Sequence, residues 1–252
     1  MSKQKNNSSR HFGIRKRIQL FFKVNWYKTL YFNFKMLPFA DAKKLPFFFY
    51  GKVKFSSLNG SVAIEAPITR AMIGFGQPYE MNTIHIGIAE IMLSGTMTFN
   101  GYAQFGKDYF ICIKKEAVCS FGNMSSLGSR GKIICTNWVE LGDYARLGSE
   151  CQIIDTNFHK MIDTATKKEY EMSQPIKLGN YNFISNRVTI LSKTITPDYC
   201  TIASNTLCNK NYQSLGDNIL VGGIPAKLLK ENISRDWEGE QAVMLKNLII
   251  YK

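Results

Sequence analysis

A six-residue repeat constrains the fold of this chain more than any other feature of its sequence. Between Leu178 and Lys210 the sequence divides into LGNYNF, ISNRVT, ILSKTI, TPDYCT and IASNTL, followed by CNK. An aliphatic residue opens most units, and a small or β-branched residue stands fifth in most of them. The exceptions are Thr196 and Cys208 at the opening position and Asn182 at the fifth. This period matches neither the 3.6 residues of an α-helix nor the alternation of a strand.

The same period recurs nearer the N-terminus. The openings there are Leu141, Leu147 and Ile153; Phe121, Leu127 and Ile133; and, more weakly, Leu93, Phe99, Phe105 and Ile111. A period of six suits a short extended piece followed by a sharp corner, repeated around a triangular prism with about three units to a coil. The pattern therefore predicts an all-β solenoid, a left-handed parallel β-helix, whose crossovers are an exception to the usual right-handed rule. An ordinary β-sandwich is the alternative.

The sequence outside the repeat predicts three parts. Residues 1–50 form a basic amphipathic segment, residues 51–225 the β-helix, and residues 226–252 a C-terminal helix and tail. Apolar residues spaced by three and four between Arg10 and Lys35 predict one or two amphipathic helices. Residues 1–60 carry 13 Lys or Arg and one acid, so they account for +12 of the net charge of +13. The rest of the chain is near neutral, which argues against a basic, nucleic-acid-binding body.

Several protein classes do not fit this composition. No stretch approaches the roughly 18 apolar residues that span a bilayer, and the N-terminus does not read as a cleaved secretory signal. The six cysteines include no CxxC pair and no Cys/His metal spacing. We therefore expect free thiols in a reducing cytoplasm.

The repeat is interrupted once, after Ile153. About twenty mostly polar residues, at about 154–175, precede the next clean opening at Ile176 or Leu178. Such a segment cannot lie on a prism face, so we expect a loop extruded from the β-helix, and long loops in compact folds are often functional. It begins Asp155-Thr156-Asn157-Phe158-His159. An imidazole titrates near neutrality and suits a general base; a solvated loop histidine is the alternative.

These features resemble the hexapeptide-repeat acyltransferase family. With the ending VGGIPAKLLKEN, Val221–Asn232, they cover roughly residues 90–232. That ending is similar to the family's closing signature, in which a Gly-x-Pro-Ala-Lys turn leaves the β-helix and starts the C-terminal helix. The N-terminal segment YKTLYFNFKMLPFADAKKLPFFFYGKV is similar to openings of bacterial surface-polysaccharide O-acetyltransferases of this family. The resemblance implies a homotrimer that moves an acetyl or other acyl group from coenzyme A to a sugar hydroxyl or amine.

The resemblance also implies catalytic residues. The family's catalytic histidine stands at the root of such a loop, in motifs that look like Asp-x-x-x-His, which match His159. It would remove the acceptor's proton during direct attack on the thioester and return it to the departing thiolate. Asp155, or failing that Asp163, would hold the imidazole, although both could equally cap the loop. The three histidines of zinc-dependent hydratases with this fold are missing, since the body contains only His85 and His159.

The same resemblance places acetyl-coenzyme A along the later coils, in a groove between two subunits, held largely by backbone groups. By their positions in the repeats and the closing signature, the implied contacts are Asn186, Ser204, Asn209, Lys210, Lys227 and Lys230. The lysines would pair with the coenzyme's phosphates; a solvated lysine face is the alternative. The family favours Gly in second place, where this chain has Gly179 but also Ser185, Pro197 and Ala203, which changes the local corner geometry.

The basic N-terminal segment has three interpretations. It suits peripheral contact with the inner, anionic face of a membrane, close to a lipid-linked sugar acceptor. It also suits packing across the trimer or over the open end of the β-helix. Binding to nucleic acid is the third interpretation, which we do not expect because the rest of the chain is near neutral. For the whole chain, the alternatives to sugar acylation are transfer to a small acceptor of the serine or antibiotic type, or a non-catalytic β-helix scaffold.

Overall fold

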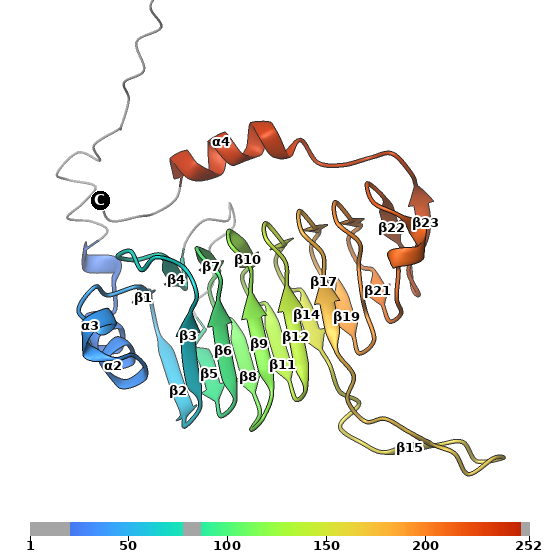
Figure 1. Ribbon diagram of the computed structural model, residues 1–252, viewed down its shortest axis with the longest axis horizontal. Helices are drawn as coiled ribbons and strands as arrows, with labels where there is room; N and C mark the ends of the chain where they lie inside the picture. Colours follow the sequence, from blue (N-terminus) through green and yellow to red (C-terminus); the bar gives the residue numbers. More distant parts are fainter. Residues whose placement is uncertain (1–20, 78–86, 248–252) are drawn as a thin grey trace, which may run out of the picture.

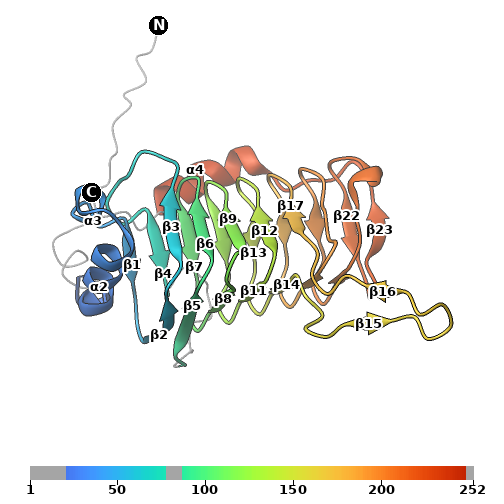
Figure 2. The same ribbon diagram turned by 60° about the horizontal axis from the view of Figure 1, so that its bottom comes forward.

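A computed structural model describes residues 21–77 and 87–247 (Figures 1 and 2). His11, His85 and the first part of the predicted amphipathic segment lie outside these residues. The described chain is mostly β, with short strands in three sheets that form an elongated rod. Two helices lie at its N-terminal end and one runs along its side (Figure 1).

Successive strands of the rod enter the three sheets in turn. The first sheet contains β1 (Phe47–Phe49), β4 (Ile73–Phe75), β7 (Ala103–Phe105), β10 (Ser125–Leu127), β13 (Arg146–Leu147), β18 (Phe183–Ile184), β20 (Thr201–Ile202), β22 (Leu220–Gly222) and β23 (Lys227–Lys230). The second contains β2 (Val53–Leu58), β5 (Ala89–Leu93), β8 (Phe110–Ile113), β11 (Lys132–Cys135), β14 (Gln152–Ile154), β19 (Thr189–Leu191) and β21 (Leu207–Cys208). The third contains β3 (Ser61–Ile64), β6 (Thr96–Phe99), β9 (Val118–Phe121), β12 (Trp138–Leu141) and β17 (Ile176–Leu178). Within these sheets the pairings are parallel, except that of β22 with β23.

The register follows the six-residue period where the sequence is most regular. Ile184 pairs with Ile202, 18 residues further on, which is three units of six. Nearer the N-terminus the coils are longer, since Phe105 pairs with Leu127 and Leu127 with Leu147. The parallel sheets confirm that part of the fold prediction, and the left-handed, closed form stays a prediction.

The inward-facing side chains stack from coil to coil into a continuous apolar core. Ile111, Ile133, Ile153 and Ile190 pair in sequence across four strands, and all are buried. Phenylalanines take the equivalent places nearer the N-terminus, where the rings of Phe75 and Phe105 stack with their centroids 4.2 Å apart. Burying each such side chain contributes roughly 1.5–3 kcal/mol, so the repeated opening residue stabilises the rod along its whole length.

Two departures from the repeat compensate each other. Thr196 opens a unit where an aliphatic residue is usual, and Asn182 stands fifth where a small residue is usual; both are buried. The Thr196 hydroxyl donates to Asn182 Oδ1 at 2.5 Å and accepts from Gly179 N–H at 3.0 Å. Asn182 Nδ2 donates to the carbonyl of Pro197 at 2.8 Å. The polar groups that these residues bring into the core therefore satisfy each other.

This pair gives a testable stability effect. We expect Asn182→Val to lower the free energy of unfolding by about 1–3 kcal/mol, because Thr196 loses its acceptor and Pro197 its side-chain donor. Adding Thr196→Val should then cost less than it does in the wild-type chain, with a coupling energy of about 1 kcal/mol. Urea unfolding of the two single variants and the double variant measures this coupling. Strict additivity would contradict the bond.

Helices cover the N-terminal end of the rod. They are α2 (Trp26–Met36) and α3 (Phe39–Ala42). Phe32 of α2 is buried, with its ring centroid 5.1 Å from that of Phe47 and 5.0 Å from that of Phe49. Asn33 Nδ2 donates to Phe47 O at 2.8 Å, and Thr29 Oγ1 accepts from Phe49 N–H at 3.1 Å. The helix thus satisfies polar groups of the first strand, which would otherwise be an open sheet edge.

The C-terminal region differs in detail from the expectation. A turn after β22 leads first into β23, which pairs antiparallel with β22, and α4 (Trp237–Asn247) begins only later. A short 3-10 helix, η1 (Gln213–Leu215), precedes β22. The closing signature was expected to start the helix directly, but its Lys227 begins a strand instead. None of the helices in the described parts of the chain is long and apolar enough to cross a membrane.

Candidate active site

The interruption of the repeat forms an arm that extends away from the rod (Figures 1 and 2). The arm is inserted between β14 and β17, and it contains the two-stranded antiparallel sheet of β15 (Met161–Ile162) and β16 (Glu169–Tyr170). Because of this insertion Leu147 pairs with Ile184, 37 residues on, whereas Ile184 pairs with Ile202 only 18 residues on. The structure thus places a hairpin where the sequence predicted an extruded loop.

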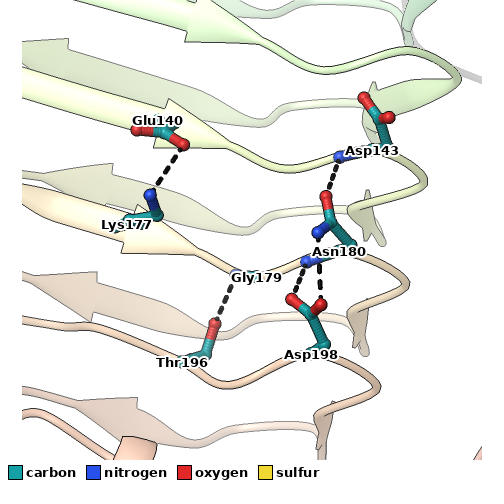
Figure 3. Close-up of polar contacts among 7 residues, drawn as sticks. All are labelled: Glu140, Asp143, Lys177, Gly179, Asn180, Thr196 and Asp198. Carbon is teal, nitrogen blue, oxygen red and sulfur yellow. Dashed lines mark hydrogen bonds and ion pairs between the residues drawn. The ribbon is translucent and has the colours of Figure 1, made fainter.

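The coils on either side of the arm stay in contact across the insertion (Figure 3). Lys177 Nζ lies 3.2 Å from the Glu140 carboxylate. At the following corner Asp143 N–H donates to Asn180 Oδ1 at 2.9 Å, and Asn180 N–H donates to Asp198 Oδ1 at 2.7 Å. Each corner side chain therefore holds the backbone of the preceding coil, and the arm leaves the stack without breaking it.

Asp155 fixes the root of the arm. Its side chain is buried and its carboxylate accepts hydrogen bonds from Thr136 N–H at 2.8 Å, Thr136 Oγ1 at 2.9 Å and Asn137 N–H at 2.7 Å. Its backbone carbonyl accepts from Gln174 N–H at 2.9 Å, on the returning strand of the arm. Thr136 Oγ1 also lies 2.8 Å from Ser173 Oγ. Asp155 thus joins the outgoing and returning strands to the previous coil.

His159 stands just beyond this rigid root. Asn157 N–H donates to Met172 O at 2.9 Å, which keeps the two strands of the arm together. The Thr156 hydroxyl accepts from Phe158 N–H at 3.0 Å, and Phe158 takes a left-handed φ of 60°. This bend precedes His159, which is exposed and is the only histidine in residues 21–77 and 87–247. The histidine is therefore accessible to a substrate on a segment with fixed ends.

Asp163 lies further out, where it caps the turn at the arm's tip. Its Oδ1 accepts from Ala165 N–H at 2.9 Å and Thr166 N–H at 2.8 Å. The hydrogen bond from the Thr166 backbone is the largest cause that lowers the pKa of the Asp163 carboxyl. Asp155 and Asp163 thus both accept hydrogen bonds from backbone N–H groups. For each of them, a role in orienting His159 stays a prediction.

The residues predicted to bind coenzyme A fall on two corners of the last coils and on β23. Asn186 and Ser204 follow β18 and β20, which pair in register, so they occupy the same corner of neighbouring coils. Asn186 Oδ1 accepts from Ser149 N–H at 3.0 Å. In the next coil Val221 pairs with Ile202, so Gly222 opens the same corner, and Lys227 pairs with Gly222. The structure therefore brings these three predicted contacts close to one corner of the rod.

The other predicted contacts lie elsewhere. Asn209 and Lys210 follow β21 at a different corner, and Lys210 Nζ lies 5.4 Å from the centroid of the Tyr212 ring. Lys230 pairs with Leu220 at the far end of β23. All three are exposed, which is compatible with a phosphate-binding surface and with a solvated lysine face.

A tyrosine ladder along another corner was not predicted. The rings of Tyr144 and Tyr181 stack with centroids 5.0 Å apart, and those of Tyr181 and Tyr199 with centroids 4.9 Å apart. Trp237, the first residue of α4, packs its ring edge-on to Tyr181 at 5.6 Å, and Arg235 lies 5.3 Å from the Trp237 ring. The signal was in the repeat, since Tyr is fourth in LGDYAR, LGNYNF and TPDYCT. The ladder docks the C-terminal helix on the rod.

The cysteines serve packing. All six are free and buried, and burial raises the pKa of the Cys200 and Cys208 thiols to about 12. Thiolate is the reactive form, so we expect the native protein at pH 8 to react at least ~10² times more slowly with a thiol reagent such as dithiobisnitrobenzoate than the unfolded chain does. Absorbance of the released thiol measures this, and rapid labelling of the native protein would contradict it.

Among the described residues no group of three His, Cys, Asp or Glu side chains could hold a metal ion.

Solved structures similar to this chain are acetyl- and acyltransferases. No family model and no curated protein matches the sequence. The polysialic-acid-specific acetyltransferase NeuO matches with a TM-score of 0.49 and 15% identity over 82% of this chain and 90% of its own. A mutant of AntD, an N-acyltransferase from Bacillus cereus, in complex with dTDP and coenzyme A, matches with a TM-score of 0.47 and 11% identity over 84% and 99%. The polysialic acid O-acetyltransferase OatWY matches with a TM-score of 0.40 and 17% identity over 73% and 90%.

Proposed function

We propose that this chain is a coenzyme A-dependent acyltransferase of the hexapeptide-repeat family, built on a left-handed parallel β-helix. It moves an acetyl or other acyl group to a hydroxyl or amine of a sugar in surface-polysaccharide biosynthesis. The observation that carries the proposal is the arm. It leaves an otherwise continuous stack of coils and presents an exposed histidine beside a root fixed by Asp155. The resemblance of the same segment, Asp155 to His159, to the family's catalytic motif supports the same conclusion.

His159 acts as the general base in this proposal. Its imidazole takes the proton from the acceptor's hydroxyl or amine as that group attacks the thioester carbonyl. The carbon–sulfur bond then breaks, and the proton passes to the thiolate to give free coenzyme A. The acyl group goes directly to the acceptor, and the burial of all six cysteines supports a route without a cysteine-bound acyl intermediate.

The coenzyme lies along the last coils, where the chain offers Asn186, Ser204 and Lys227 near one corner. Lys210, Asn209 and Lys230 would meet its phosphates from the neighbouring surfaces. The backbone N–H and C=O groups at these corners are suited to an extended, amide-containing pantetheine arm.

We propose that the protein works as a cytoplasmic homotrimer. The arm exposes five large apolar side chains, each between 46% and 54% exposed, Phe158, Met161, Ile162, Tyr170 and Met172. Such a cluster on a protruding segment is typical of an interface, and a neighbouring subunit would bring its own coils up to His159. Sedimentation equilibrium should give the mass of three chains.

The function is tested by a thiol-release assay. The purified protein is incubated with acetyl-coenzyme A and a panel of sugars, lipid-linked saccharides, serine and aminoglycosides, and free thiol is measured with a chromogenic disulfide. We expect acceptor-dependent release with a saccharide. Release only with serine or an aminoglycoside would favour the small-acceptor alternative. No acceptor-dependent release from any acyl donor would favour a non-catalytic scaffold.

A further inference from the structure

The helix α2, which covers the N-terminal end of the rod, has an inner face that packs on the rod and an apolar outer face that is exposed. Its inner face consists of Thr29, Phe32, Asn33 and Met36, at spacings of three and four, and packs on β1. Its outer face has the same spacing and consists of Tyr27, Leu30, Tyr31 and Phe34, which are 73%, 43%, 47% and 47% exposed. The inner face meets the needs of the fold, so the outer face requires a separate explanation.

The outer face continues onto α3. Tyr27 and Tyr31 stack with their ring centroids 6.3 Å apart. Phe34 lies 6.0 Å from Phe39, which is itself 73% exposed. We define the cap surface as Tyr27, Leu30, Tyr31, Phe34 and Phe39. It is a largely aromatic, exposed strip at the N-terminal end of the rod, and patches of this kind on protein domains mark interaction sites.

The segment that carries the cap surface is rich in cations. Residues 21–54 contain seven lysines and one acid: Lys23, Lys28, Lys35, Lys43, Lys44, Lys52, Lys54 and Asp41. Asp41 is paired with Lys44 at 3.1 Å, Lys54 Nζ lies 3.5 Å from the Glu90 carboxylate, and Lys28 Nζ lies 4.7 Å from the centroid of the Phe55 ring. On α2, Lys28 and Lys35 are seven residues apart, so they share one flank of the helix beside the aromatic strip. Residues 1–20, whose structure is not described, add six further cations and no acid in sequence.

From this arrangement we infer that the cap surface docks the protein on an anionic lipid surface. The aromatic side chains lie at the headgroup level and the flanking lysines contact lipid phosphates, as in helices that lie in the plane of a membrane. A second copy of the chain fits less well, because a symmetric contact would bring the same lysine-rich rims together. Nucleic acid would meet the charge, but the exposed aliphatic side chain of Leu30 is better suited to lipid than to a nucleic acid strand, which binds by stacking of its bases on aromatic rings.

The inference is independent of acyl transfer, so it is tested with the full-length protein by binding alone. The probe is sedimentation with vesicles of phosphatidylcholine, with or without about one-third phosphatidylglycerol. We expect binding to the anionic vesicles only, weakened when the ionic strength rises from about 0.1 M to about 0.5 M. Equal binding to neutral vesicles, or no binding to either, would overturn the inference.

Variants separate the two parts of the surface. Tyr27→Ser, Phe34→Ser and Phe39→Ser together should lower the partition coefficient at least ~10-fold through lost apolar burial. Lys35→Gln with Lys43→Gln should lower it about 5-fold for each lysine. The controls are the exposed residues Ile224 and Trp138 changed to Ser, and Lys115 and Lys132 changed to Gln, which lie on later coils of the rod and should bind like wild type.

Three further results would overturn the docking assignment. The first is that the cap variants pellet as well as wild type. In the second, the intact protein binds single-stranded RNA through the same residues and ignores the vesicles, which would mark a nucleic-acid surface. In the third, the cap variants change the mass of the assembly without affecting vesicle binding, which would mark a contact between copies.

Discussion

Turnover in the His159→Ala variant should fall at least ~10²-fold, because the acceptor loses the base that removes its proton. The KM for acetyl-coenzyme A should change little, since the predicted coenzyme contacts lie on the coils and not on the arm. The fold should be unaffected, because the side chain is exposed and such surface changes usually alter stability by less than about 0.5 kcal/mol. Initial rates of thiol release over a range of coenzyme concentrations give both constants.

The neighbouring residue provides a matched control. Lys160 is also exposed on the arm, where its Nζ pairs with the Glu169 carboxylate. Exposed ion pairs contribute little to stability, so Lys160→Ala should keep turnover within about threefold of wild type. A His159→Ala protein with near-normal turnover would remove His159 from the mechanism. Equal losses in both variants would assign the effect to the arm's conformation.

The repeat made much of the rod predictable. An aliphatic residue that recurs every six positions can be buried only if each unit turns a corner, and the openings named from sequence, such as Ile184, Ile190 and Ile202, are buried and paired in register. The weaker trace through Phe99 and Phe105 also proved to be core. The period of six is interrupted after Ile111 by extra residues in the turns, since Phe99 pairs with Phe121 and Phe105 with Leu127, each 22 residues on.

Other features could not be derived from the period. The strand β1 begins at Phe47, ahead of the expected start at residue 51, because an all-apolar Phe47–Phe49 run reads equally well as part of a connector. β23 was not predicted, although Lys227–Lys230 alternates like a strand. These four residues were assigned to the C-terminal helix and tail because the segment that follows is rich in helix-forming residues. Both elements lie at an end of the stack, where a strand has one neighbouring coil and the repeat no longer constrains it.

The sequence predicted where the arm leaves the repeat, but it did not predict the hydrogen-bond partners of the residues at the root of the arm. The break in the period predicted an inserted segment, and the arm between β14 and β17 confirms it. The catalytic role of His159 on that arm stays a prediction. The hydrogen-bond partners of Asp155 are Thr136 and Asn137, in the previous coil. Such contacts depend on which residues of neighbouring coils lie opposite each other, and the spacing of residues within one loop does not reveal this. Asp155, a candidate partner of His159 by its place in the Asp-x-x-x-His motif, thus joins the arm to the previous coil.

Asp155 should therefore have the largest effect on stability of any residue in the arm. Removing its buried carboxylate by Asp155→Ala takes away the acceptor of the partly buried backbone N–H groups of Thr136 and Asn137. Charge-assisted bonds are about twice as strong as neutral ones, and each hydrogen bond to a charged group contributes about 1.5–3 kcal/mol. We expect the free energy of unfolding to fall by about 3–5 kcal/mol, measured by urea denaturation with an unchanged m-value.

Asp163→Ala is the matched control, because Asp163 also accepts backbone hydrogen bonds but lies in an exposed turn at the arm's tip. It should cost less than about 1 kcal/mol, since water replaces the lost acceptor. Activity distinguishes the two roles of Asp155. In Asp155→Asn, assayed where the protein is still folded, a loss in turnover as large as that of His159→Ala would support an orienting role. A stability loss with turnover within about tenfold of wild type would confine Asp155 to the root of the arm.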